Sequence, residues 1–216
     1  MNMILSPGRK YVFVHIPKTG GTSMALALEA RARADDIMLG DTPKASRRRK
    51  RLRNVKTRGR LWKHSSLADI EGLLPDTQLR SLYAFTLVRN PWDRVVSLYH
   101  WLRNQGFEHP SVQLAKATDF SGFIADEATQ FALRQSPVRA YMTHADGQEQ
   151  CDTYIRLEHF EADAAPLFRH LGFSLTLDRV NRSDRGAEYR PYYTDHTAEI
   201  IAEACADDIQ RFGYRF

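Results

Sequence analysis

The feature that most constrains the fold is a short apolar run that enters a glycine-containing turn. Residues 11–16 read YVFVHI, and this β-branched and aromatic run ends at Pro17, which is typical of a buried strand. The turn KTGGTS follows at residues 18–23, and the chain then becomes rich in helix formers. A strand, a glycine turn and a helix in this order direct several backbone N–H groups to one point at the positive end of the helix dipole. The sequence therefore predicts an anion-binding loop.

The residue types in this turn suit a phosphate-like ligand. Gly20 and Gly21 let the backbone approach an anion closely, Lys18 adds a cation, and Thr22 or Ser23 is expected to cap the helix and to offer a hydroxyl. In an ATP-type loop the lysine follows the glycines and the next hydroxyl binds Mg²⁺, whereas here the lysine comes first and no G-K-[ST] occurs. The pattern therefore favours an anion site that uses no metal.

The rest of the chain alternates strand-like and helix-like segments. Further strands are expected at residues 83–88 and 153–156. Helices are expected at residues 67–74, 158–171 and 195–212, from the opening at Asn90-Pro91 through Leu102, and over most of 119–141 with breaks at Gly122 and Pro137. This alternation predicts an α/β fold in which helices flank a mainly parallel central sheet. No repeat or boundary interrupts it, so we expect a single domain over residues 1–216.

Charge is concentrated in one segment. The net charge is +5, and residues 44–60 hold ten Lys and Arg without an acid. We expect a loop or frayed helix over about 42–63, most simply a solvated one, with binding of an anionic acceptor as the second interpretation. Nucleic-acid binding ranks third, because only Trp62 flanks the run as a stacking aromatic.

Composition limits the class of protein. A hydrophobic fraction of 43% supports a real core and excludes a wholly disordered chain. The two cysteines, Cys151 and Cys205, form no disulfide framework, no run is apolar enough to span a membrane, and the first ten residues lack a signal-peptide pattern. The sequence thus predicts a cytoplasmic protein.

Two motifs together resemble the sulfotransferases that use 3′-phosphoadenosine 5′-phosphosulfate (PAPS). HIPKTGGTS, residues 15–23, is similar to their 5′-phosphosulfate loop, and LVRNPWDRVVSLY, residues 87–99, is similar to their 3′-phosphate motif. The resemblance is strongest to the carbohydrate branch, the heparan 2-O- and 6-O-sulfotransferases and their bacterial relatives. Later segments agree with it: Arg156-x-Glu158, Asn181-Arg-Ser183, YRPYY at 189–193 and FGYRF at 212–216.

The resemblance implies a fold, a cofactor and a set of residues. The fold would be P-loop-kinase-like, PAPS would be the donor and PAP the product, and the reaction would be in-line transfer of the sulfuryl group to a hydroxyl without a metal. Lys18 would contact the 5′-phosphosulfate and stabilise the departing oxygen. The residues that would bind the rest of the cofactor are Thr19, Gly20, Gly21, Thr22 and Ser23 at the 5′-phosphate, and Arg89 and Ser97 at the 3′-phosphate.

Transfer to an alcohol also needs a base, and histidine titrates in the useful range. Of the eight histidines, His64 follows the basic segment and opens HSSLADI, a position similar to that of the base in the bacterial and 6-O-type relatives. The His-x-His pair of the 2-O type is absent. The resemblance therefore implies His64 as base and a hydroxyl-bearing acceptor, such as an anionic glycan.

Two other functions remain open at this point. One is a P-loop-related kinase of a small molecule, and the other is a non-catalytic nucleotide- or RNA-binding protein. Stabilisation by PAP without metal distinguishes the sulfotransferase from both, because the kinase requires Mg-ATP and an RNA-binding protein responds steeply to salt.

Overall fold

The computed structural model describes residues 2–178 and 188–216. The chain divides into two compact units, residues 1–88 with 138–180 and residues 89–137 with 181–216. Each unit is described by itself.

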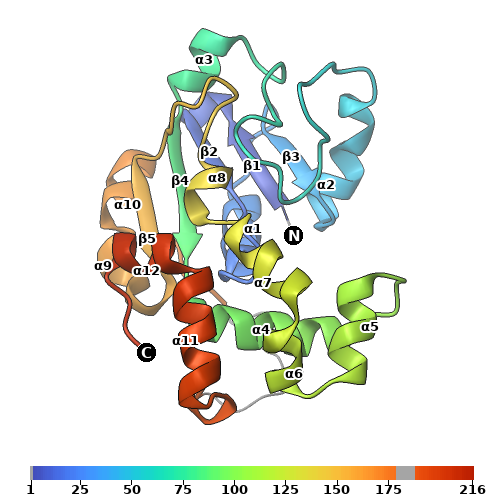
Figure 1. Ribbon diagram of the computed structural model, residues 1–216. Helices are drawn as coiled ribbons and strands as arrows, with labels where there is room; N and C mark the ends of the chain where they lie inside the picture. The colour runs from blue at the N-terminus through green and yellow to red at the C-terminus, as the bar shows by residue number, and fades with distance from the viewer. Residues whose placement is uncertain (1, 179–187) are drawn as a thin grey trace. The chain divides into compact units, whose positions relative to one another are not determined.

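The first unit is built on a five-stranded sheet with the order β3-β1-β2-β4-β5 (Figure 1). The strands are β1 (Asn2–Ser6), β2 (Tyr11–Val14), β3 (Ile37–Gly40), β4 (Tyr83–Val88) and β5 (Thr153–Arg156). β4 pairs in parallel with both β2 and β5, while β1 pairs antiparallel with β2 and β3. The α/β class and the three strands expected from the sequence are confirmed.

The sheet is mixed. The strands β2, β4 and β5 are parallel as expected, but the expectation of a mainly parallel sheet is wrong for β1 and β3, which pair antiparallel. β1 and β3 were not predicted. The 3₁₀ turn η1 (Pro7–Arg9) and Lys10, at φ 54°, reverse the chain between β1 and β2. So short a connection can join only antiparallel strands, because a parallel pair needs a crossover of a dozen or more residues.

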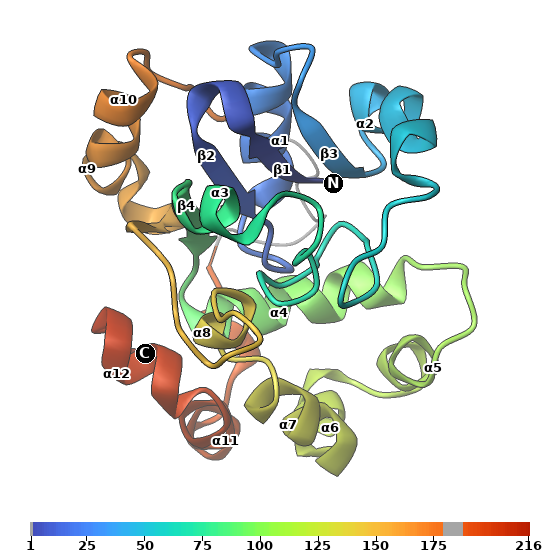
Figure 2. The same ribbon diagram turned by 90° about the horizontal axis from the view of Figure 1, so that it is seen from above.

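Helices and irregular segments cover both faces of this sheet. On one face, α1 (Gly21–Ala30) and α10 (Ala165–Leu171) pack on Phe13, Phe85 and Ile155. On the other face, side chains from residues 67–82 and Met142 pack on Val12 and Ala84. Figures 1 and 2 both show α2 (Pro43–Arg48) beside β3, and α9 (Phe160–Asp163) and α10 beside β5. The remaining short elements of this unit are η2 (Arg49–Leu52), α3 (Asp76–Arg80), α8 (Val138–Tyr141) and η3 (Leu157–His159).

The helix expected over residues 67–74 is absent, and the chain makes turns there. The backbone N–H groups of Leu67 and Ala68 donate to the carbonyls of Tyr141 and Thr143, at 2.9 and 3.2 Å. A nearby segment thus takes donors that a helix would use, and the helix α3 forms only after Pro75.

The second unit is helical. Its elements are α4 (Pro91–Arg103), α5 (Pro110–Ala117), α6 (Phe120–Ala125), α7 (Glu127–Arg134), η4 (Arg190–Tyr192), α11 (Asp195–Ala204) and α12 (Ala206–Phe212). Its core gathers Trp92, Val96 and Tyr99 from α4, Phe123 from α6 and Ile201 from α11. The long expected helix at residues 195–212 is broken at Cys205.

Across the described ranges, no helix combines the length and the apolarity needed to cross a membrane.

Candidate active site

The predicted anion loop lies between β2 and α1 and has an unusual backbone. Lys18 has φ 67° and Gly20 has φ 86°, so two of its residues occupy the left-handed region. For a lysine this conformation is uncommon, and such strain is retained where the surrounding structure requires it. The hydroxyl of buried Thr19 donates to the carbonyl of Ile16 at 2.9 Å and closes the turn.

The N-terminus of α1 has no side-chain cap within the described structure. Gly20 is the N-cap, no side chain among the described residues caps the helix, and its first turn has no acid. The expectation that Thr22 or Ser23 caps this helix is therefore wrong, because both residues lie inside its first turn. The helix has ten residues, and because no acid lies in its first turn, the positive end of its dipole stays available to an anion. The donor set thus fits a phosphate group.

Gly21 is required by a close approach of His15. A Cβ on Gly21 would lie 2.1 Å from Cδ2 and 2.5 Å from Nε2 of the His15 ring. His15 is 2% exposed, and its Nδ1 is buried without a hydrogen-bond partner in the described structure. Burial, and then the neighbouring His64, hold the pKa of His15 well below its usual range. The imidazole beside the loop is therefore neutral.

His64 lies against the same strand end. Its Nδ1 is 2.7 Å from the carbonyl oxygen of His15, and the two rings meet edge to face with centroids 4.6 Å apart. On another side, the Trp62 ring contacts His64 at 5.1 Å between centroids. His64 is 8% exposed and Trp62 is 45% exposed. The sequence-predicted base and the loop that holds Lys18 thus share His15 as a common neighbour.

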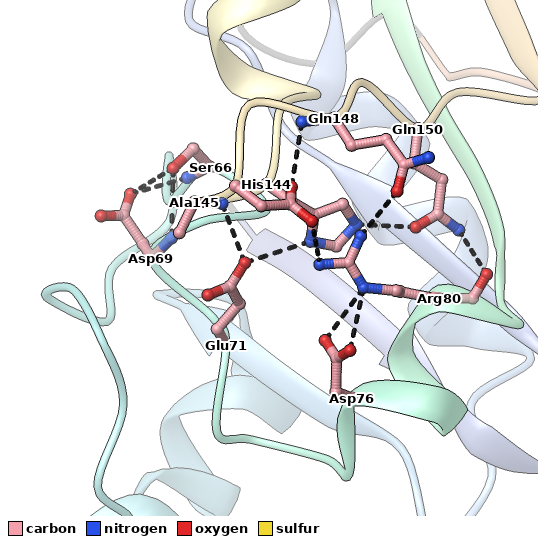
Figure 3. Close-up of polar contacts among 10 residues, drawn as sticks. Ser66, Asp69, Glu71, Asp76, Arg80, His144, Ala145, Gln148 and Gln150 are labelled. Carbon is pink, nitrogen blue, oxygen red and sulfur yellow. Dashed lines mark hydrogen bonds and ion pairs between the residues drawn. The ribbon is translucent and has the colours of Figure 1, made fainter.

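Polar contacts fix the turns that carry His64. The Ser65 hydroxyl accepts from the N–H of Trp62 at 2.9 Å, and the carboxylate of Asp69 accepts from the N–H and hydroxyl of Ser66 at 2.8 and 2.9 Å. Further along, the carboxylate of Glu71 accepts from the N–H of Ala145 at 2.9 Å (Figure 3).

Buried His144 extends this network toward the start of the parallel strands. Its Nδ1 lies 3.4 Å from Glu71 and its Nε2 lies 2.8 Å from the side chain of Gln150, which donates to the carbonyls of Arg80 and Leu82 (Figure 3). The turns behind His64 are therefore tied to the loop that precedes β5.

The residues expected at the 3′-phosphate belong to the second unit. Arg89 directly follows β4 in the chain, and its Nε donates to Asp93 at 2.7 Å. Asn90 caps α4, where its side-chain oxygen accepts from the N–H of Trp92 at 3.0 Å and of Asp93 at 3.3 Å. Ser97 is buried, two turns into α4. Asp93 thus does more than place a charge at the helix start, because it also orients the guanidinium.

The C-terminal motifs support the start of α4. The Tyr193 hydroxyl donates to the carbonyl of Trp92 at 2.8 Å, and the Asn90 amide donates to the Tyr189 hydroxyl at 3.3 Å. Phe216 packs on the Trp92 ring at 5.5 Å. Arg156, in the first unit, instead pairs with Asp163, and this ion pair lowers the pKa of that carboxyl. The predicted motif at Asn181–Ser183 lies outside the described residues.

Two contributors to the site escaped the sequence analysis: Trp62 as a neighbour of His64, and Asp93 as the partner of Arg89. Arg89 and Asp93 are four residues apart, so the spacing of local ion pairs could have indicated this pair. The contact of His64 with the His15 carbonyl spans 49 residues, and no local pattern predicts it. Within the described ranges no group of three or more His, Cys, Asp or Glu is arranged to hold a metal ion.

Comparison with known proteins identifies the family of the chain. The model of the sulfotransferase family matches residues 1–214. None of the curated proteins compared with the chain matches it. Among solved structures, the crystal structure of mouse sulfotransferase SULT7A1 complexed with PAP is similar over 94% of this chain and 84% of that chain, with 16% identity and a TM-score of 0.48. Because the family model spans nearly every residue, the chain belongs to the sulfotransferase family and is an enzyme.

Proposed function

We propose that this enzyme transfers the sulfuryl group of PAPS to a hydroxyl of a carbohydrate, with Lys18 and His64 as its catalytic residues. The observation that carries the proposal is the bond between His64 Nδ1 and the His15 carbonyl, at 2.7 Å. It ties the candidate base to the strand end from which the candidate cofactor loop begins.

The cofactor loop has the properties that PAPS requires. The backbone of residues 19–23 would hold the 5′-phosphate at the uncapped end of α1, and Arg89 and Ser97 would hold the 3′-phosphate. PAPS, when bound, supplies the sulfuryl group and PAP as the leaving group. Lys18, in its left-handed conformation, would place an ammonium against the charge that develops on the leaving oxygen.

The tautomer of His64 suits a general base. A carbonyl oxygen only accepts hydrogen bonds, so Nδ1 of His64 must carry the proton that it shares with His15. In the neutral ring, Nε2 then carries the lone pair that can accept a proton. An acceptor hydroxyl placed at Nε2 would lose its proton to this atom as its oxygen attacks sulfur.

The surroundings of His64 favour a sugar as acceptor. Trp62 is 45% exposed beside the base, and a half-exposed indole offers a flat apolar face of the kind that packs on a sugar ring.

The basic segment is not a free loop, because Arg48, Arg49 and Arg51 donate to backbone carbonyls at 3.0, 3.3 and 2.8 Å. We therefore favour an anionic glycan that this segment attracts.

Two acceptors of different pKa test the assignment of roles. Lys18→Ala should slow transfer to a sugar alcohol and to an acidic phenol alike, because Lys18 acts on the leaving group. His64→Ala should cost about 10²–10⁴ in rate for the alcohol and much less for a phenol that is already ionised. PAP affinity should survive His64→Ala, and circular dichroism should confirm folding of both variants. Equal losses on both acceptors would remove His64 from the base role.

Further parts of the interpretation stay predictions. These are the cytoplasmic location, the bacterial source and the action of residues 1–216 as one domain. A reaction without metal is likewise proposed, and transfer that persists unchanged in excess chelator is its test.

A further inference from the structure

His15 touches both halves of the proposed chemistry. It directly follows β2, and Ile16 and Pro17 separate it from the cofactor loop at residues 18–23. Its ring fills the space over Gly21, and its carbonyl accepts from His64. The ring is also in edge contact with His64, at 4.6 Å between centroids, and is stacked on Phe13 from behind, at 6.1 Å. The two contacts to His64 therefore come from one residue.

These contacts leave the His15 ring little freedom. Phe13 lies behind it, Gly21 lies so close that a single added carbon would overlap it, and the side chain is 2% exposed. Close-packed interiors transmit displacement, since no void absorbs it. A change in the position of this ring must therefore move either the first turn of α1 or the ring of His64.

We propose that His15 is a positioning residue, which holds the ring of His64 in the orientation that proton removal requires. The inference rests on the proposed base role of His64. In this proposal His15 does not contact the acceptor. It acts through the edge contact with the His64 ring and through the carbonyl that fixes the tautomer of His64.

The neutral state of His15 agrees with this role. Its Nδ1 is buried and has no hydrogen-bond partner among the described residues, and burial followed by the proximity of His64 lowers its pKa. A buried polar atom that no group satisfies is costly, so packing alone would favour a carbon ring at this position. Like a carbon ring, a neutral imidazole adds no positive charge beside a base that must accept a proton.

Two variants of His15 and one control separate positioning from packing. His15→Ala removes the edge contact, and misplacement of a catalytic group by about 1 Å costs on the order of 10²-fold in rate. We expect that loss in kcat on the alcohol acceptor, with the acceptor KM and the PAP affinity nearly unchanged. His15→Phe keeps a ring and should recover most of the rate. Phe13→Leu is the matched control for disturbance of the core, because it changes a buried apolar neighbour of the His15 ring and leaves the edge contact with His64 in place.

The loss should also follow the signature of the base. On the ionised phenol His15→Ala should cost little, and the double variant His15→Ala/His64→Ala should be no slower than His64→Ala alone. If the two losses multiply instead, or if Phe13→Leu slows the alcohol reaction as much as His15→Ala does, His15 does not act through His64 and the inference is wrong. If His64→Ala alone retains the rate on the alcohol, the proposed base role fails first, and the inference fails with it.

Discussion

At the scale of single residues, the site is defined by side chains whose chemistry depends on one neighbour each. His64 owes its tautomer to the His15 carbonyl, and Arg89 owes its orientation to Asp93. The pair of Arg89 and Asp93 differs from a surface ion pair of small effect, since the two side chains are only 15% and 18% exposed. Substitution at such positions should therefore change specific steps.

Arg89→Ala should weaken PAP far more than adenosine 5′-phosphosulfate, which lacks a 3′-phosphate. The lost contact would be a charge-assisted hydrogen bond, for which about 1.5–3 kcal/mol is usual, or roughly 10- to 150-fold in Kd. Isothermal titration with both ligands measures the difference. Arg89→Lys, which keeps the charge but not the planar fork, should fall between. An equal loss for both ligands would show that Arg89 does not recognise the 3′-phosphate.

His15 should make stability fall in mildly acidic solution. In the unfolded chain its pKa is near 6.5, and burial lowers it in the fold. Below pH 6.5 the unfolded state therefore binds more protons, so the free energy of unfolding decreases as pH falls and recovers as pH rises. The slope from this residue is at most about 1.4 kcal/mol per pH unit. Urea unfolding between pH 7 and 5 should show it in the wild type and less of it in His15→Phe. Parallel curves for the two proteins would contradict it.

At the scale of elements, the cap of α4 connects stability to the site. The Asn90 side chain accepts from two backbone N–H groups and donates to the Tyr189 hydroxyl and the Arg215 carbonyl. It is also buried, which makes each bond costly to lose. The residue next to Arg89 therefore holds both the helix start and the C-terminal segment.

Asn90→Ala should destabilise the protein by about 2 kcal/mol, at the upper end of the range for caps. Asp126→Ala, which removes the α7 cap that accepts from the N–H of Thr129, is the control and should cost about 1 kcal/mol. Asn90→Asp should keep the cap and lose only the amide donors. Denaturant unfolding of the three variants makes the comparison, and an Asn90→Ala loss no larger than that of Asp126→Ala would count against the added role.

Elements were predictable where local patterns decide them. The strands β2, β4 and β5 and the helix α4 follow from apolar runs, from Asn90-Pro91 and from helical spacing. β1 and β3 are no shorter than β2 and β5, but they were missed because they become strands by pairing, β1 with β2 and β3 with β1. The same holds in the site. The loop at 18–23 is local, whereas the contacts of His64 with His15 depend on tertiary structure.

At the scale of the whole molecule, charge is the property to test. Arg47, Lys50 and Arg53 are exposed in the basic segment, and none of them holds a distant carbonyl as Arg51 does. Because the Debye length is about 10 Å at 0.1 M salt, their attraction for an anionic acceptor must be sensitive to ionic strength.

Changing Arg47, Lys50 and Arg53 to Gln should raise the KM for an anionic glycan at low salt several-fold and flatten its salt dependence. A neutral acceptor should be unaffected. The control variant, with Gln at Lys116, Arg134 and Arg169, removes the same number of exposed charges elsewhere. If both triple variants respond alike, net charge and not this segment governs the acceptor KM.

The mixed sheet also has a consequence for how the chain folds. β1 and β2 pair across a connection of four residues, with Ile4 opposite Phe13, so their closure costs little entropy. The parallel partners β2 and β4 are far apart in sequence, with Tyr11 opposite Tyr83. A long loop must therefore close before their contacts can stabilise the pair. We expect the N-terminal hairpin to form early and to offer β2 as the template on which β4, and then β5, are added. The cofactor loop, which hangs from the end of β2, would then be among the first parts of the active site to find its place.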